Sequence, residues 1–368
     1  MPSELSPNFR DYMQRGMDLR HSFSPPLLDL IDAAGRAVTR SLAMGGRVYF
    51  FGNGGSAADA QHLAAELSGR FKTERRPLPG LALTTDSSAV TAIANDYGYE
   101  SVFERQLRAF AQPCDIAIGI STSGNSPNVV RGLEAAGEMG LATMAWTAQA
   151  GGRCAEIADI AIRVPSTSTE LVQEIHAAIG HYICHRVDDV FTDRADSIPV
   201  LREVTGKAVS MSELLALREF WREAGVRMVW TNGCFDLLHA GHLQSLQYAR
   251  EAGDVLVVGL NTDASIATLK GPSRPINRQE NRVSVLAGLD AVSYVVLMDE
   301  LDPCSTLDQL RPDFHCKGAD YRDVPDAKIP EKAIVERHGG KVIYAPLAAG
   351  LSTTAIAEQL AEGQCSSV

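Results

Sequence analysis

Apolar residues recur along the chain at helical and strand-like spacings in turn. Residues 8–43 come close to the 3.6-residue period of a helix, through Leu27, Leu30, Ile31, Ala34, Val38 and Leu42. After this flanking helical region, short apolar runs alternate with segments of helical period. The predicted strands are 47–51, 81–83, 115–120, 142–147 and 160–164, and the predicted helices are 56–68, 87–95, 127–139 and 169–191. Such alternation predicts βαβ units and a mostly parallel sheet.

A second alternating series follows a stretch without a sustained core pattern. We therefore predict a first domain at 1–192, a linker at 193–209 and a second domain at 210–368. Ser210 to Glu213 forms a capping box that opens a helix ending near Gly225. Further strands are expected at 228–230, 255–260, 294–298, 314–317 and 341–345, with helices after His242, at 280–289 and 327–338, and from Ser352. The fold class predicted is α/β, with two different doubly wound parallel-sheet domains.

Length and composition agree with two globular domains and limit the kinds of binding partner. A chain of 368 residues, 45% apolar, 21% charged and with 31 glycines, is typical of an α/β protein. It has no apolar run long enough to span a membrane and no secretory signal, so we expect a cytoplasmic protein. Seven cysteines without CxxC spacing suit reduced thiols. The net charge of −11 argues against nucleic acid, so anionic substrates need local dipoles and a few cations.

Two loops in the first half are rich in glycine and hydroxyl side chains. Gly52-Asn-Gly-Gly-Ser56 and Ser121-Thr-Ser-Gly-Asn-Ser126 each follow a predicted strand. Backbone N–H groups there can converge on an anion, with Ser56 capping the next helix. One such loop is more often a plain turn, but two at strand ends of one sheet favour phosphate binding. Hydroxyls without lysines suggest a single phosphate group.

Candidate acid–base and metal-binding side chains lie on two predicted helices. His62 and Glu66 are four residues apart and share a helix face, while Gln173 and His181 lie on the closing helix. A lone helical histidine is more often a core or surface residue. His185, four residues after His181, makes an equally good pair by spacing.

These motifs together resemble the sedoheptulose 7-phosphate isomerases, which have the sugar isomerase fold and make a heptose 7-phosphate. The resemblance covers about residues 40–190 and rests on His62-Leu-Ala-Ala-Glu66 after the glycine loop, Ala94-Asn-Asp96, the serine loop and Gln173 to His181. Just before Gln173 the chain has Thr169-Glu-Leu-Val172, where the family more often has an Arg-Ile pair. This difference leaves open which heptose or shorter sugar is preferred.

The resemblance implies a role for each matched position. The phosphate is expected on Ser56, Ser121, Thr122, Ser123 and Ser126, and the sugar on Asn53, Gly54, Asn95 and Asp96, with Gly55 in the same substrate set. Zn²⁺ is expected on His62, Glu66, Gln173 and His181, of which Glu66 and His181 also match the acid–base pair. Moving a carbonyl through an enediol needs a base for the carbon-bound proton and an acid for the oxygen. Zinc would polarise the carbonyl as a Lewis acid.

The spacing of two of these residues bears on oligomeric state. Gln173 and His181 are eight residues apart, about 12 Å along a straight helix, too far to reach one ion from the same segment. Either Gln173 lies ahead of the helix, or the ligands come from two subunits. We predict a homo-oligomer with shared sites, a tetramer through the first domain.

The second half contains a strand, a glycine turn and a helix start that carry two histidines. Thr231-Asn-Gly-Cys-Phe-Asp236 leads into His239-Ala-Gly-His242, an arrangement that predicts a nucleoside triphosphate site. It resembles the cytidylyltransferase-type nucleotidyltransferases, whose fold is Rossmann-like. The closer resemblance, over about residues 211–362, is to heptose 1-phosphate adenylyltransferase domains, through 261–264, 269–275, 279–282, 317–321 and 350–354.

That resemblance implies in-line attack of a sugar 1-phosphate oxygen on the α-phosphorus of a nucleoside triphosphate, with pyrophosphate leaving. Catalysis would then be mostly positioning and charge neutralisation. The residues implied are Thr231, Asn232, Gly233, Phe235, His239, His242, Lys270 and Lys317, with Ser352, Thr353 and Thr354 on the β- and γ-phosphates. Asp320 is a lower-ranked candidate, and a lysine such as Lys317 is as often a surface charge. Mg²⁺ is expected to bridge phosphate oxygens.

The two resemblances lead to one prediction. The chain is expected to convert sedoheptulose 7-phosphate to D-glycero-D-manno-heptose 7-phosphate, and to transfer a nucleotidyl group, from ATP, to heptose 1-phosphate to give ADP-heptose. The alternative is a phosphosugar-sensing or interaction module fused to a glycerol 3-phosphate-type cytidylyltransferase.

Overall fold

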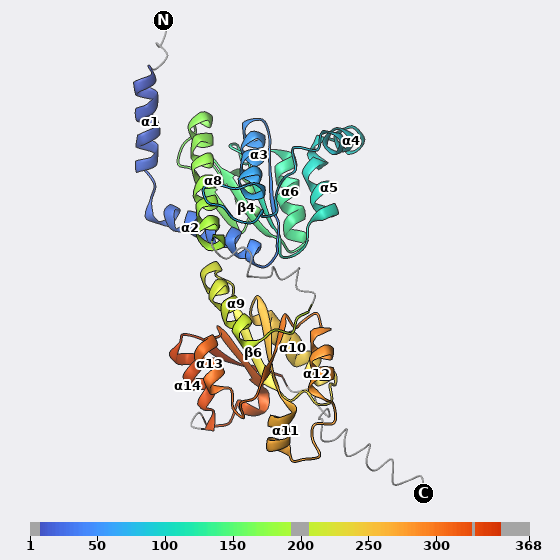
Figure 1. The fold of residues 1–368 in the computed structure, drawn as a ribbon. Coiled ribbons are helices and arrows are strands. Elements are labelled where there is room, and N and C mark those ends of the chain that lie inside the picture. The colour runs from blue at the N-terminus through green and yellow to red at the C-terminus, as the bar shows by residue number, and fades with distance from the viewer. Residues whose placement is uncertain (1–7, 193–205, 326–327, 347–368) are drawn as a thin grey trace, which may run out of the picture. The chain divides into compact units, whose positions relative to one another are not determined.

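The computed structural model describes residues 8–192, 206–325 and 328–346 (Figure 1). The chain divides into two compact units, residues 1–198 and 199–368. Residues 193–205, most of the predicted linker, lie outside the described residues. So do Ser352, Thr353, Thr354 and the helix predicted to start there.

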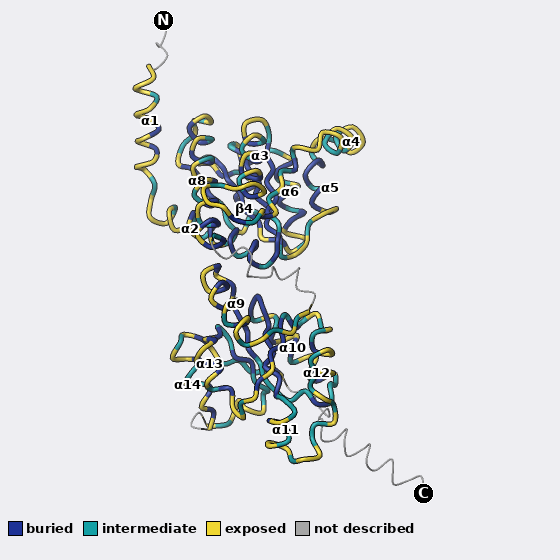
Figure 2. The backbone as a smooth tube through the Cα atoms, in the orientation of Figure 1, coloured by how far each residue is buried: buried dark blue, intermediate teal, exposed yellow. Residues whose placement is uncertain are grey.

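The first unit is built on a five-stranded parallel sheet with the strand order β2-β1-β3-β4-β5. The strands are β1 Val48–Gly52, β2 Gly80–Ala82, β3 Ile116–Ile120, β4 Ala142–Thr147 and β5 Ile160–Arg163. Every residue of β1 and β3 is buried, which is why these runs are uniformly apolar and do not alternate. Figure 2 shows the buried backbone along the strands.

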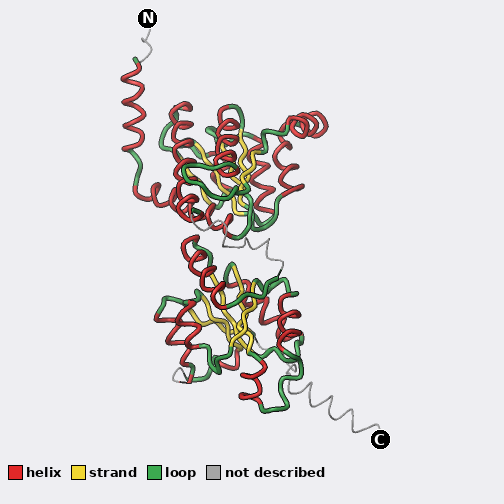
Figure 3. The backbone as a smooth tube through the Cα atoms, viewed as in Figure 1, coloured by secondary structure: helices red, strands yellow, loops and turns green. Residues whose placement is uncertain are grey.

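Helices cover both faces of this sheet, as the alternating pattern predicts. Tyr49, Phe51 and Ala117 face a core shared with α5 Val102–Phe110, α6 Pro127–Glu138 and α7 Gly152–Ile157. The opposite face contacts α2 Pro25–Ala43 and α3 Gly55–Ser68, and α8 Thr169–Phe191 reaches it through His176, whose ring lies beside that of Trp146 in β4. Helix α4 Ser87–Tyr97 and the short helix η1 Tyr99–Ser101 lead into α5. Figure 3 shows the strands enclosed by helices in each unit.

The helical region predicted at 8–43 consists of two helices. Helix α1 Phe9–His21 is followed by α2, which begins at Pro25 after the cap residue Ser24. Pro25 and Pro26 explain the break, because proline has no N–H to donate within a helix and suits the first turn.

Helices α3 and α8 pack very closely and are joined by a buried ion pair. A Cβ at Gly180 would stand 2.3 Å from Leu63 of α3, so only glycine permits this approach. Beyond the end of α3, the Arg75 guanidinium donates to Asp188 of α8 at 2.8 Å and to the carbonyl of Glu66 at 2.7 Å. Both side chains of the ion pair are almost fully buried. These contacts fix α3 relative to α8.

The second unit has another five-stranded parallel sheet, with the order β10-β9-β6-β7-β8. Its strands are β6 Met228–Gly233, β7 Val255–Asn261, β8 Tyr294–Met298, β9 Phe314–Gly318 and β10 Lys341–Ala345. The capping box predicted at Ser210 and Glu213 is confirmed at the start of α9 Met211–Ala224. Ala208, inside the predicted linker, pairs with Val295 of β8.

Helices lie on both faces of the second sheet, so the α/β prediction is confirmed for both units. One face packs on α10 Ala240–Ala252 and α12 Gln279–Ala287 through Leu246 and Leu286. On the other face Trp221 of α9 contacts Tyr294, with α13 Cys304–Leu310 beside α9. The described residues of this unit also form the helices α11 Asp263–Lys270, η2 Ala319–Tyr321 and α14 Pro330–Arg337. Within the described residues no helix has the length and apolarity needed to cross a membrane.

We predict that Asp188→Ala destabilises the first unit by about 3–5 kcal/mol, because it leaves the Arg75 charge buried without its partner. Amide hydrogen exchange over α3 and α8 measures this change region by region. The matched control is Asp189→Ala, since the neighbouring Asp189 is half exposed and makes only surface ion pairs. Equal protection of α3 and α8 in the two variants would contradict the structural role of the pair.

The same pair predicts an acid dependence. Burial acts to raise the pKa of Asp188, but hydrogen bonds from Lys72, Arg75 and Thr73 outweigh it and lower the pKa. A carboxyl group whose pKa is lower in the folded state than in the unfolded state stabilises the fold fully at pH values above the unfolded pKa of about 3.9. This contribution is lost as the pH falls through the folded pKa, in the wild type and not in Asp188→Ala. Urea unfolding monitored between neutral and acidic pH for the two proteins measures the difference.

Candidate functional sites

The two loops predicted to bind phosphate lie at the point where the first sheet reverses its strand order. From β1 the chain moves to β2 on one side and to β3 on the other. The loops after β1 and β3 therefore leave neighbouring parallel strands at the same edge. Ligands of doubly wound sheets bind at such a switch point.

The first loop turns sharply into α3. Gly54 has a φ of 56°, which favours glycine, and it is the N-cap residue of α3, which starts at Gly55. Ser56 therefore lies inside the first turn, and the prediction that Ser56 caps this helix is wrong. Its side chain is buried at the start of the helix.

Hydroxyl groups of the second loop converge on one another. The Oγ of Ser121 lies 3.3 Å from that of Ser123 and 3.1 Å from that of Ser126. Gly124 has a φ of 66°, and a Cβ there would stand 1.9 Å from the carbonyl oxygen of Gly151. Glycine is thus required for the loop to close, and the closed loop holds the serines together, with Thr122 between them.

The residues predicted to contact the sugar come from separate elements. Asn53 follows β1 and exchanges two hydrogen bonds with the side chain of Asn128, at 2.9 and 2.8 Å. Asn95 and Asp96 are exposed at the end of α4, where the Asn95 amide donates to Asp96 at 2.7 Å. Asn128 was not singled out in the sequence, because one asparagine after a proline has no distinctive spacing.

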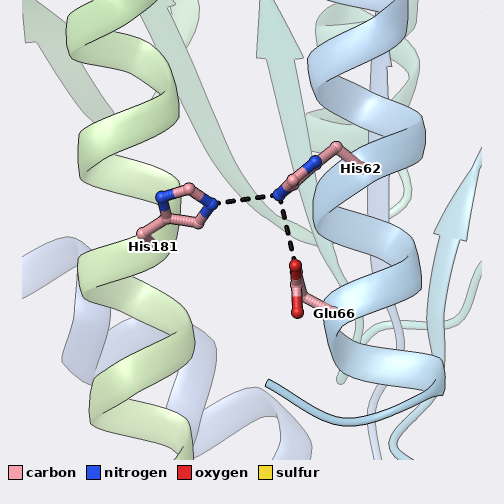
Figure 4. A group of neighbouring side chains, drawn as sticks. All are labelled: His62, Glu66 and His181. Atoms are coloured by element: carbon pink, nitrogen blue, oxygen red, sulfur yellow. Dashed lines mark hydrogen bonds and ion pairs between the residues drawn. The ribbon is translucent and has the colours of Figure 1, made fainter. Parts of the chain in front are cut away.

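Figure 4 shows His62 and Glu66 on α3 facing His181 on α8. The Nε2 atoms of His62 and His181 are 3.0 Å apart, and His62 Nε2 is 3.2 Å from a carboxylate oxygen of Glu66. Each residue offers one metal-binding atom, all within 4.8 Å of one another. Two nitrogens on tetrahedral zinc stand about 3.3 Å apart, because Zn–N bonds are about 2.0–2.1 Å. The three side chains therefore fit a zinc ion by both donor type and spacing.

Gln173 lies in α8, so it is not ahead of the helix. Its side-chain amide packs where a Cβ of Gly55 would be, at the beginning of α3. His62 and His181 meet further along the two helices. His185, the competing partner by spacing, instead pairs with Asp189 at 3.3 Å.

Asp59 is a carboxylate near this cluster that the sequence did not single out. It precedes His62 by one helical turn, and its Oδ2 is buried without a hydrogen-bond partner. Burial raises the pKa of Asp59, while the nearby His62 acts to lower it. The spacing of three residues to His62 was the available signal.

The second sheet reverses its strand order between β6 and β9. The segment with His239 and His242 follows β6, and Lys317 is near the end of β9. His239 precedes α10 and its ring stacks on that of His242, with centroids 3.9 Å apart. The Nδ1 atoms of both rings are buried without partners. Burial, with the neighbouring His239 and Lys270, lowers the pKa of His242 to about 4. His242 is therefore neutral at pH 7.

Other predicted nucleotide-binding residues lie at the end of β6, in the loop after it and at the end of α11. Phe235, at a φ of 42°, places its ring 5.2 Å from that of His242, beyond Asn232 and Gly233 at the end of β6. Thr231 donates to the Cys316 carbonyl at 3.0 Å. Lys270 is exposed at the end of α11.

Lys317 is already engaged within the second unit. Its Nζ is 2.9 Å from Glu331 and 4.2 Å from the centre of the Tyr321 ring. Asp320 places a carboxylate oxygen 2.3 Å from where a Cβ of Gly318 would be. The ammonium group has three N–H donors, so a phosphate could be bound while the ion pair with Glu331 is kept.

A buried network ties the histidine loop to the segment after α11. Asp236 accepts from the Arg274 guanidinium at 2.7 Å and from the backbone N–H groups of Ile276 and Asn277. Arg282, almost fully buried, donates to the carbonyls of Cys234 and Asn261. Sequence reasoning noted these segments as motifs without assigning these side chains a role, because the contacts join residues far apart in the chain.

Comparisons with known proteins give matches in both units. A family model for the SIS domain matches residues 11–148, and a cytidylyltransferase-like model matches residues 230–359. The chain is 54% identical over 166 residues to a phosphoheptose isomerase of Aquifex aeolicus, covering 45% of this chain and 86% of that protein. It is 50% identical over 178 residues to one of Maridesulfovibrio salexigens, covering 48% and 87%. A solved phosphoheptose isomerase of Neisseria gonorrhoeae has 37% identity and a TM-score of 0.46, covering 49% and 97%.

We predict that Gly180→Ala weakens zinc binding and slows any isomerisation on the order of tenfold to a hundredfold. The added methyl group collides with the buried Leu63 and separates α8 from α3, and small displacements of site groups have effects of this size. Zinc affinity is measured by competition with a chromophoric chelator. Gly137→Ala in α6 is the control, because nothing lies within 4 Å of its added Cβ. Unchanged zinc affinity in a folded Gly180→Ala protein would contradict the prediction.

Proposed function

This chain belongs, through its first unit, to the phosphoheptose isomerase family, and we propose that it isomerises sedoheptulose 7-phosphate to D-glycero-D-manno-heptose 7-phosphate. Its second unit has a cytidylyltransferase-like domain, so the protein is an enzyme with an isomerase and a nucleotidyltransferase part. We propose that the second unit transfers the adenylyl group of ATP to heptose 1-phosphate. The products are ADP-heptose and pyrophosphate.

The approach of His62, Glu66 and His181 to one another carries the isomerase proposal. A sensor module needs to bind a phosphosugar but needs no acid, base or metal. Here two imidazole nitrogens and a carboxylate oxygen converge, and two of the three residues, His62 and Glu66, lie on the helix that starts at a candidate phosphate loop. This cluster favours catalysis over sensing alone.

In the proposed isomerisation, the serines of the two loops hold the phosphate and Glu66 and His181 move protons. One of the pair takes a proton from C1 of the ketose, and the other gives a proton to the oxygen on C2, which produces an enediol. Loss of the O1 proton and return of a proton to C2 then give the aldose. Zinc, held by His62, Glu66 and His181, would supply Lewis-acid polarisation of the carbonyl.

We propose that a second subunit contributes the fourth ligand. Gln173 is about two helical turns from His181 on α8, and its side-chain amide packs at Gly55, at the start of α3. The site would then be completed in a homo-oligomer, a tetramer through the first unit. A fully active monomer in light scattering at assay concentration would refute this proposal.

In the proposed nucleotidyl transfer, His239 and His242 donate hydrogen bonds to the triphosphate and Lys270 supplies charge. The oxygen of the sugar 1-phosphate attacks the α-phosphorus as the bond to the β-phosphate oxygen breaks, and pyrophosphate leaves. Thr231, Asn232, Gly233 and Phe235 shape the nucleotide site, and Mg²⁺ is expected on the phosphate oxygens. Lys317 is assigned a phosphate contact through an N–H that is not given to Glu331. Roles for Ser352 to Thr354 rest on the sequence resemblance.

Two assays test the proposed substrates. In the first, the protein is incubated with sedoheptulose 7-phosphate and Zn²⁺, and aldoheptose formation is followed. Binding without any aldoheptose would favour the sensor alternative. In the second, pyrophosphate release is measured for ATP, GTP, CTP and UTP, each with heptose 1-phosphate and with glycerol 3-phosphate. Preference for CTP and glycerol 3-phosphate would overturn the adenylyltransferase assignment.

We predict that Glu66→Gln abolishes isomerisation and leaves pyrophosphate release within about threefold of the wild type, and that His242→Ala does the reverse. The reason is that the two residues lie in separate compact units, and mutations far apart without shared partners act independently. Both activities are measured on each purified variant. Parallel loss of both activities in either variant would contradict independent sites.

A further inference from the structure

A chain of hydrogen bonds runs from the backbone of α6 to a tyrosine at the candidate sugar site. The backbone N–H of Val129 donates to Asn128 Oδ1 at 3.0 Å. The Asn128 amide donates to Asn53 Oδ1 at 2.8 Å, and the Tyr99 hydroxyl donates to the same oxygen at 3.2 Å. Asn128 is almost fully buried, whereas Tyr99 is 54% exposed.

This chain fixes the orientation of each polar group in turn. A backbone N–H can only donate, so the end of the Asn128 side chain that faces Val129 is its oxygen. The Asn128 nitrogen then faces Asn53, and the atom of Asn53 that receives it is its oxygen. A carbonyl oxygen has two acceptor positions, both of which are used on Asn53. The Tyr99 proton is therefore committed to Asn53, and the phenol oxygen remains an acceptor.

Tyr99 is held in place by the packing of η1 on α6. Arg131 of α6 donates to the Ser101 hydroxyl at 3.2 Å and lies 3.8 Å from the Glu100 carboxylate. Ser101 in turn donates to the carbonyl of Tyr97 at 3.2 Å. The segment that carries Tyr99 is thus joined at several points to the helix that carries Asn128, so the phenol is pre-positioned.

We propose that Tyr99 is a substrate-binding residue of the first unit, which accepts a hydrogen bond from a hydroxyl of the sugar chain through its phenol oxygen. Asn53 has one N–H not given to Asn128, and it donates to a second sugar oxygen. Asn128 is the positioning residue that orients both. The inference rests on the proposed isomerase function and adds a specificity contact for hydroxyl groups at the β1 edge of the site.

Tyr99→Phe tests this proposal, because it removes the phenol oxygen and keeps the ring. The KM for sedoheptulose 7-phosphate is expected to rise about 5- to 10-fold with kcat little changed, the effect of one neutral hydrogen bond. Inhibition by inorganic phosphate is expected to stay the same, since phosphate would be held by the serine loops. The matched control is Tyr97→Phe, an equally exposed tyrosine whose ring instead stacks with Arg105. An unchanged KM in Tyr99→Phe would overturn the proposal.

A double-mutant cycle with Asn128→Asp separates an ordered contact from a general loosening of the site. The carboxylate introduced by this substitution has no N–H to give to Asn53 Oδ1, and its oxygen repels that atom. The Asn53 amide is then displaced, and Tyr99 loses its oriented acceptor. Adding Tyr99→Phe to Asn128→Asp should then change KM by less than about twofold, whereas independent effects would multiply. Multiplying effects would contradict the hydrogen-bond chain. Failure of the wild type itself to make aldoheptose would instead refute the proposed function, and binding of sedoheptulose 7-phosphate measured by calorimetry would still test Tyr99.

Discussion

The close packing of α3 against α8 is the constraint on which the first site depends. His62 and Glu66 lie on one helix and His181 on the other, so their approach is set by the distance between two backbones. Gly180 permits that distance, because any larger residue would collide with Leu63. The buried Arg75–Asp188 pair then joins the ends of the two helices. A buried ion pair has a desolvation cost that limits its net stabilisation, whereas removal of one partner leaves an uncompensated buried charge.

In the second unit, the candidate site residues are held in position by a different kind of interaction. Its candidate site is formed by loops, and loops need partners that replace the regular hydrogen bonds of helices and strands. Arg282 donates to carbonyls at the ends of β6 and β7, while Asp236 accepts backbone N–H groups from the segment after α11. One buried cation and one buried anion thus hold the loop that carries His239 beside the segment that follows Lys270.

The sequence predicted the fold well where the signal was local. Apolar runs and helical periods identified both sheets, and glycine and hydroxyl residues after strands identified the loops at the switch points. It did not reveal α5, α7, α11 or α13, because these helices span nine residues or fewer, which is too short for a period to be recognised with certainty. It also left Gly180, Arg75 and Asp188 unnoticed, because a glycine in a helix has no distinctive local pattern and Asp188 is 113 residues from Arg75. Lys317 was identified by a motif, but its ion pair with Glu331 is a tertiary contact that the motif does not contain.

Because most cations near the second site are paired, oriented hydrogen-bond donors matter more there than net positive charge. The chain has a net charge of −11, and the cations Lys317, Arg274 and Arg282 each have a carboxylate partner. With its pKa near 4, His242 is a neutral imidazole at pH 7 and offers a hydrogen bond without a full charge. A triphosphate brings its own negative charge, which would raise that pKa and strengthen the hydrogen bond. In the proposed reaction the triphosphate would supply the charge itself, and the exposed Lys270, close enough to lower the pKa of His242, would add a cation.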